Sequence, residues 1–130
     1  GFNTFIPLKY RAGNNAMSHL GEVSIIEDLK NYAVARLYMD NIAHVKAYWP
    51  MIGRQTTQLA LSYGVDDIDG TIDDSTTIYS AAGSEEQNPA LSTKQLIHLV
   101  QSAGYDAIER DTVYNTIHDY TGVDLATADI

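Results

Sequence analysis

The pattern of apolar and polar positions in the first third of the chain predicts a strand followed by a helix. Residues 2–8 are rich in aromatic and β-branched side chains and lead into a polar, turn-prone tract at residues 11–15. Ser24 stands three residues before Glu27, as in a helix capping box, and apolar residues then recur at every fourth position. These features predict a helix over residues 25–40.

The rest of the chain continues this alternation. Gly64 and Gly104 each follow an amphipathic stretch and mark the end of a helix, and Ser92 with Gln95 forms a second capping box. The elements expected after the first helix are a strand at 44–49, a helix at 54–63, a strand at 65–72, a helix at 92–103, a strand at 105–111 and a helix at 112–119.

Alternating strands and helices favour parallel βαβ units, and therefore an α/β fold. A chain of 130 residues fits one domain, which we place at residues 1–120, with a polar tail at 121–130 that lacks a pattern. Three or four strands are too few for a closed barrel of eight. The sheet is therefore expected to be small and open, or part of a barrel that other residues complete.

Composition excludes several classes of function. Eight Lys and Arg against 17 Asp and Glu give a net charge of -9, which disfavours nucleic acids and anionic membranes as partners. The chain has no cysteine, so it cannot form disulfides, thiolate nucleophiles or cysteine-ligated metal sites. No signal peptide or membrane span is visible, which makes a cytoplasmic location the default. The start at Gly1, directly before an apolar segment, indicates a piece of a longer protein.

The stretch GVDDIDGTIDD at residues 64–74 resembles a calcium-binding loop, but an EF-hand reading fails. With Gly70 at the sixth position, Val65 and Thr76 would occupy two essential ligand positions. As a strand, the stretch instead places Asp67, Asp69 and Thr71 on one face. Ligands of α/β folds bind beyond the carboxyl ends of strands. Asp67, Asp69, Gly70 and Thr71 are therefore expected to line a binding site, unless these acids are simply solvated.

A second candidate site follows the first strand. Lys9, Arg11, Asn14 and His19 bring cations and amide or imidazole donors to one long loop, and such donors suit a carboxylate. The alternative is an ordinary polar surface. The four histidines show no metal-ligand spacing, and neither a catalytic triad nor a phosphate-binding loop is present, so no metal or catalytic residue is assigned.

Several segments together resemble a known enzyme family. The aminofutalosine synthase family of radical S-adenosylmethionine enzymes, which acts in the futalosine route to menaquinone, is similar to this chain over residues 2–115. The segments that carry the resemblance are FIPLKY (5–10), DL (28–29), AVARL (33–37), DNI (40–42), HVKAYW (44–49), AL (60–61), DDIDGT (66–71) and ERDTVYN (109–115).

The resemblance implies that this chain is the C-terminal part of a TIM-like radical enzyme barrel. In the family, an N-terminal cysteine motif holds a [4Fe–4S] cluster that cleaves S-adenosylmethionine. The adenosyl radical then adds to an enolpyruvyl benzoate, and loss of carbon dioxide leads to aminofutalosine. Without those cysteines the chain alone is expected to be inactive and to need the N-terminal part of the same enzyme.

The site roles that follow are hypotheses. Lys9, Arg11, Asn14 and His19 would bind the substrate carboxylates, and the acidic stretch from Asp67 to Thr71 would bind S-adenosylmethionine. The related dehypoxanthine futalosine cyclase and the deazaflavin-forming synthase share the pattern more loosely. An alternative of another class is a small-molecule-binding or self-associating α/β module, and open sheet edges would also favour a homodimer of this chain.

Overall fold

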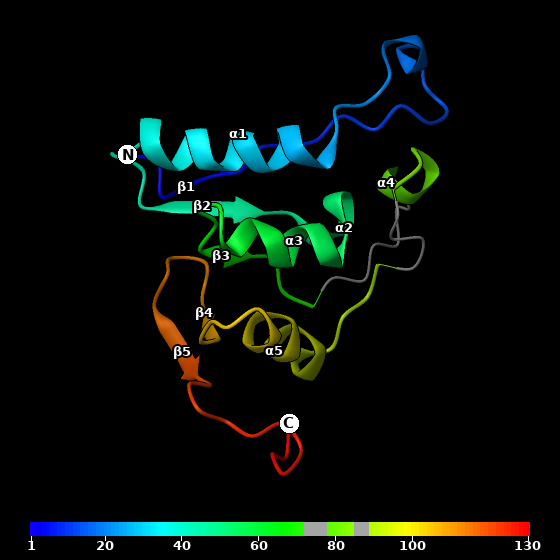
Figure 1. Cartoon of the computed structure of the whole chain (residues 1–130). Helices are drawn as coiled ribbons and strands as arrows, with labels where there is room; N and C mark the ends of the chain where they lie inside the picture. The colour runs from blue at the N-terminus through cyan, green and yellow to red at the C-terminus, as the bar shows by residue number, and fades with distance from the viewer. Residues whose placement is uncertain (72–77, 85–88) are drawn as a thin grey trace.

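The computed structural model describes residues 1–71, 78–84 and 89–130 and shows a small sheet layered against helices (Figure 1). No helix in these ranges is both long and apolar enough to cross a membrane. In chain order the elements are β1 (Thr4–Phe5), the 3-10 helix η1 (Ser18–Leu20), α1 (Ile25–Tyr38), β2 (His44–Ala47), α2 (Trp49–Ile52), α3 (Arg54–Leu61), β3 (Asp67–Ile68), α4 (Ile78–Ala81), α5 (Thr93–Ser102), β4 (Ile108–Arg110) and β5 (Thr116–Asp119).

Three of the strands form a parallel sheet in the order β1-β2-β3, which confirms the predicted α/β class and its βαβ units. Thr4 pairs with His44, and Lys46 pairs with Asp67. β4 and β5 form a separate antiparallel pair. The sheets of the described residues are small and do not close on themselves, so a barrel is not seen within this chain.

The core lies between the sheet and the two long helices that follow its first strands. Val45 and Ala47 of β2 are fully buried against Leu29 and Tyr32 of α1 and Ala60 of α3. α1 and α3 also contact one another. Both helices therefore cover the same face of the sheet, as right-handed crossovers require.

Local capping signals place the helix starts where the sequence predicts them. The Ser24 side chain accepts a hydrogen bond from the Glu27 backbone N–H at the start of α1, which ends two residues earlier than expected. Both hydrogen bonds of the second capping box, formed by Ser92 and Gln95, are present at the start of α5. Ser92 Oγ accepts from the Gln95 N–H at 3.2 Å, and Gln95 Oε1 accepts from the Ser92 N–H at 2.8 Å.

The helix predicted at residues 112–119 is wrong, because this segment forms the turn after β4 and then β5. The Asp111 side chain accepts hydrogen bonds from the backbone N–H groups of Val113 and Asn115, both at 2.9 Å. Tyr114 adopts a left-handed φ of 67°. These side-chain bonds stabilise a turn that competes with helix formation.

Other differences concern element lengths. Trp49, expected at the end of the second strand, begins α2, and Pro50 in its first turn suits a helix start. β3 is limited to two residues, and Ile72, the last residue of the expected strand, lies outside the described residues. In the C-terminal tail, Val123 and Leu125 pack against buried residues of α5 and the hairpin, so the tail is part of the packed structure.

Candidate functional site

Polar side chains cover the face of the sheet opposite α1 and α3. Residues in register on parallel strands point the same way, so Thr4, His44, Lys46 and Asp67 share one face. Asp69 joins them, because Lys46 Nζ lies 3.1 Å from its Oδ1. Parallel sheets usually carry apolar residues on both faces. These five residues, the polar sheet face, therefore need partners.

The turn between β4 and β5 supplies some of these partners. The Asp67 carboxylate, whose side chain is 8% exposed, accepts hydrogen bonds from Arg110 Nε at 2.8 Å and Arg110 Nη2 at 2.6 Å. It also accepts one from the Tyr114 hydroxyl at 2.8 Å. The Tyr114 ring stacks on His44 with ring centroids 3.7 Å apart, and the Arg110 guanidinium carbon lies over the Tyr114 ring, 4.2 Å from its centroid. This Asp67–Arg110–Tyr114 network fixes the hairpin to the sheet.

The charge states within this network follow from its geometry. The hydrogen bond to Asp67 raises the pKa of Arg110 and so favours its cation. Burial raises the pKa of Tyr114, and donation of its proton to Asp67 raises it further, so the phenol stays neutral. Both carboxylate oxygens of Asp67 are thereby occupied. Asp67 has little remaining capacity to bind a ligand.

Asp69 differs from Asp67 in having an unused acceptor. Its Oδ1 accepts from Lys46, whereas its buried Oδ2 accepts no hydrogen bond from any residue that the structure describes. Burial raises the pKa of Asp69, and the Lys46 ammonium offsets this only in part. A buried acceptor without a donor is costly. A ligand hydroxyl or ammonium group at this oxygen would remove that cost.

Beyond Asp69 the chain reaches the carboxyl end of β3. The Trp49 indole N–H donates to the Gly70 carbonyl at 3.2 Å, which fixes the backbone at this point. A Cβ placed on Gly70 would meet no atom within 4 Å of the described structure, and Thr71 is exposed. Gly70 and Thr71 therefore border open space at the edge where α/β folds bind ligands.

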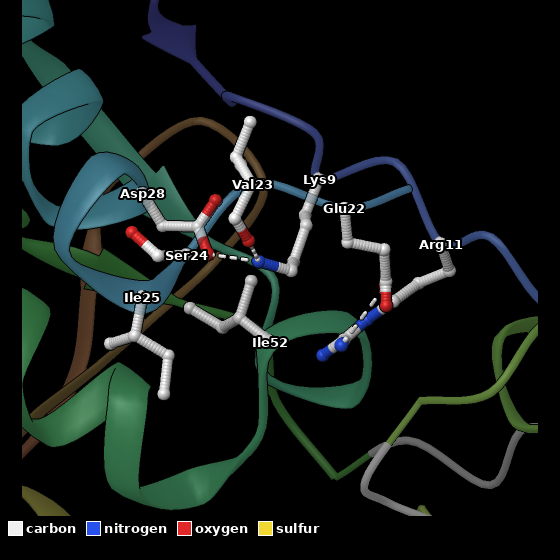
Figure 2. Close-up of a pocket in the computed structure, with 8 residues that line it drawn as sticks. All are labelled: Lys9, Arg11, Glu22, Val23, Ser24, Ile25, Asp28 and Ile52. Carbon is white, nitrogen blue, oxygen red and sulfur yellow. Dashed lines mark hydrogen bonds and ion pairs between the residues drawn. The ribbon is translucent and has the colours of Figure 1, made fainter. Parts of the chain in front are cut away.

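A cavity of about 220 Å³ lies at the same edge, between the loop after β1, the start of α1 and α2 (Figure 2). Lys9 donates to the Val23 carbonyl at 2.8 Å and forms an ion pair with Asp28, and both side chains are under 10% exposed. Arg11 donates twice to the Met51 carbonyl, at 2.9 and 2.6 Å. The residues lining this Lys9 cavity are Lys9, Arg11, Glu22, Val23, Ser24, Ile25, Asp28 and Ile52.

The two cations of the Lys9 cavity face two acids. Arg11 Nη1 lies 3.5 Å from Glu22 Oε2, a long and therefore weak contact. Lys9 is held more firmly by its buried ion pair with Asp28, which anchors the loop to the first turn of α1. Arg11 is therefore the cation whose acidic partner a ligand carboxylate could more readily replace.

Asn14 and His19, predicted with Lys9 and Arg11 to bind substrate, do not line this cavity. Asn14 donates its amide to the Ala81 carbonyl at 2.9 Å and so ties the loop to α4. His19 lies exposed in η1, within the loop that Figure 1 shows extending past the start of α1. The structure thus brings together two of the four residues of that prediction.

Sequence analysis missed four residues that belong to the polar sheet face or to the Asp67–Arg110–Tyr114 network. His44 and Lys46 alternate with apolar residues in β2, and this alternation is a signal that could have placed them on one face. Arg110 and Tyr114 gave no such signal, because they reach Asp67 only through the hairpin, whose turn and second strand were predicted as a helix. Within the described residues, no three potential metal-ligating side chains gather in one place.

Comparison with known proteins shows which family this chain resembles. The family model of the CofH/MqnC C-terminal region matches residues 1–121. Aminodeoxyfutalosine synthase of Streptomyces coelicolor is 36% identical, over 97% of this chain and 35% of that protein. Aminodeoxyfutalosine synthase of Thermus thermophilus is 34% identical, over 95% of this chain and 34% of that protein.

A third relative is named for a different reaction. Cyclic dehypoxanthine futalosine synthase of Streptomyces coelicolor is 34% identical, over 92% of this chain and 29% of that protein. The chain spans about a third of the length of the curated relatives it matches. Since the family model covers nearly the whole chain, the chain belongs to the CofH/MqnC C-terminal family.

Proposed function

We propose that this chain is the C-terminal, substrate-side portion of a radical S-adenosylmethionine enzyme that forms aminofutalosine in menaquinone biosynthesis. The observation that carries the proposal is the similarity to two aminodeoxyfutalosine synthases over at least 95% of the chain. Similarity of the same order to a cyclic dehypoxanthine futalosine synthase supports a cyclase of that pathway as the second candidate.

The open sheet supports a place within a larger barrel. Among the described residues β1 and β3 each pair with β2 alone, so each leaves one edge without a partner strand. Unpaired edges favour the addition of further strands. We propose that the rest of the enzyme continues the sheet into a TIM-like barrel, with the polar sheet face turned inward. Pairing of two copies through these edges is the alternative that remains a prediction.

The donor groups of this chain fit one of the two expected cofactors. With no cysteine, the chain offers no thiolate for a [4Fe–4S] cluster, which the remainder of the enzyme would have to hold. S-adenosylmethionine carries ribose hydroxyls and an ammonium group and supplies the adenosyl group when bound. The unused Oδ2 of Asp69 suits such a donor, and Gly70 and Thr71 lie beside it in sequence. Asp67 instead holds the hairpin in place.

The Lys9 cavity offers the better site for a substrate carboxylate. Arg11 presents a guanidinium whose Nε and Nη2 are oriented by the Met51 carbonyl and whose Nη1 has only the weak contact with Glu22. A planar guanidinium fixed in this way is suited to bind a carboxylate. Lys9 supports the loop that carries Arg11 through its ion pair with Asp28.

Product analysis of the full-length enzyme tests the proposed reaction. Anaerobically reconstituted protein is incubated with S-adenosylmethionine and either the enolpyruvyl benzoate or dehypoxanthine futalosine, and products are identified by mass spectrometry. Aminofutalosine from the first substrate supports the synthase. Conversion of the second substrate alone would assign the cyclase, and no conversion of either would favour a non-catalytic module.

Asp69→Asn tests the proposed cofactor contact. Asparagine keeps the size of the side chain but lacks the charge and one acceptor, so KM for S-adenosylmethionine should rise about tenfold, the equivalent of one charge-assisted hydrogen bond. KM for the benzoate should not change. Asp106→Asn, at an exposed position, is the matched control. Unchanged kinetics in a folded Asp69→Asn enzyme would remove Asp69 from the cofactor site without affecting the assignment of the reaction.

A further inference from the structure

A second and larger cavity lies between α3 and α5, apart from both sites described above. It encloses about 690 Å³, within the range of small-molecule sites in proteins. None of its lining residues belongs to the polar sheet face or to the Lys9 cavity. The residues that line this α3–α5 groove are Arg54, Gln58, Leu91, Lys94, Gln95, His98, Leu99, Ser102 and Leu125.

The charge of the groove is opposite to that of the chain. Among the described residues that line it are Arg54, Lys94 and His98 and no acidic side chain, whereas the whole chain carries a net charge of -9. Lys9, Arg11, Lys30, Arg36, Lys46 and Arg110 each form an ion pair with a carboxylate. Lys94 forms no ion pair with any residue that the structure describes, so its charge is available to an anion.

The groove combines this charge with an apolar floor. Leu91 and Leu99 are 5% and 6% exposed and pack against Trp49, while Leu125 reaches the groove from the C-terminal tail. Lys94 and His98 are four residues apart on α5 and therefore lie on the same side of that helix.

One wall of the groove is held in place by hydrogen bonds. The Gln58 amide of α3 donates to the Leu99 carbonyl at 3.0 Å and to Ser102 Oγ at 2.8 Å, which joins α3 to the last turns of α5. The capping box at the start of α5 fixes the opposite end of that helix. Lys94 and His98 are thus presented from a rigid helix.

We propose that the α3–α5 groove binds a small amphipathic anion, with an apolar ring or chain on the leucines and a carboxylate, sulfonate or phosphate group between Lys94 and His98. The enclosed volume favours a small molecule, and the basic lining within an acidic protein favours an anion. The groove is a site additional to those of the proposed reaction and does not depend on them.

A fluorescence titration with 8-anilinonaphthalene-1-sulfonate tests this proposal, because that probe joins aromatic rings to a single sulfonate. The purified protein, Lys94→Glu and the milder Lys94→Gln are compared, and circular dichroism confirms that each is folded. Lys94→Glu should weaken binding about five- to tenfold and Lys94→Gln about two- to threefold, since one partly exposed charge contact is lost. Lys30→Glu makes the same charge change on α1, outside the groove, and should bind the probe as the unaltered protein does.

Two results would overturn the proposal. Equal probe affinity in Lys94→Glu and Lys30→Glu would show that the groove is not where the anion binds. Binding of a glutamate-rich peptide that depends on Lys94, together with no binding of the sulfonate probe, would replace the small anion with an acidic protein partner.

Discussion

The Asp67–Arg110–Tyr114 network gives a sharp prediction about stability, because it joins the hairpin to the sheet through one buried carboxylate. Asp67 is 8% exposed and accepts three hydrogen bonds, at 2.6 to 2.8 Å, from residues 43 and 47 positions later in the chain. The perturbation is a double-mutant cycle of Asp67→Ala, Arg110→Ala and the double variant. The cycle isolates the pairwise contribution from the other effects of each substitution.

The magnitude follows from burial and hydrogen-bond number. Hydrogen bonds to charged groups contribute about 1.5–3 kcal/mol each, and loss of one partner of a buried ion pair costs about 3–5 kcal/mol. The Arg110 side chain is 24% exposed, so water compensates part of that loss. We therefore expect each single variant to lose about 3 kcal/mol and the coupling energy to be about 2 kcal/mol.

Urea unfolding at pH 7 provides the assay. Trp49, the one tryptophan of the chain, is fully buried, so its fluorescence reports unfolding. The pair Glu27 and Lys30 on α1 serves as the control cycle, because these side chains lie 3.1 Å apart but are more than half exposed. Its coupling energy should be about 0.3–0.5 kcal/mol. A coupling energy between Asp67 and Arg110 no larger than that of this exposed pair would refute the prediction.

Two further predictions concern pH and backbone conformation. Burial alone would raise the pKa of Asp66, but hydrogen bonds from His44 and the Val45 N–H lower that pKa overall. The ionised Asp66 side chain should therefore stabilise the fold above a pH of about 4, and this stabilisation should be lost as the pH falls below that. The free energies of unfolding of Asp66→Asn and the unaltered protein, from urea titrations, should differ by about 1 kcal/mol at pH 7 and converge at pH 3, and an equal difference at both would contradict this. Gly64→Ala should destabilise by about 2 kcal/mol or more in thermal unfolding, since φ is 95° and the new Cβ would lie 2.6 Å from a side-chain carbon of α1. Gly70→Ala, with open space and no positive φ, should be neutral, and equal losses at both glycines would count against the conformational explanation.

Short-range interactions explain why much of the fold could be predicted from the sequence. The helix starts at Ser24 and Ser92 depend on bonds to backbone groups three residues away, so the local sequence contains the whole signal. The parallel α/β arrangement follows from the order of strands and helices. The expectation that Asp67 and Asp69 share one face also needed only the period of a strand.

Prediction from the sequence failed where local and distant interactions compete. Val113 and Ile117 are spaced as in a helix, but the Asp111 side chain stabilises a turn and β5 pairs with β4. The loop from Lys9 to His19 shows a similar limit. Lys9 and Arg11 meet one cavity because Asp28 and the Met51 carbonyl bind them, whereas Asn14 and His19 point elsewhere.

By itself the sequence determined the α/β class, the starts of α1 and α5 and the absence of thiolate chemistry, because each depends on composition, on the order of elements or on neighbours within one helical turn. Only the tertiary structure decided which carboxylates accept hydrogen bonds at both oxygens and which do not. Asp67 and Asp69 are two residues apart and share one face, yet Arg110 and Tyr114 bind the first and leave the second with an unused oxygen. That difference depends on side chains more than 40 residues away, which only the folded chain brings together.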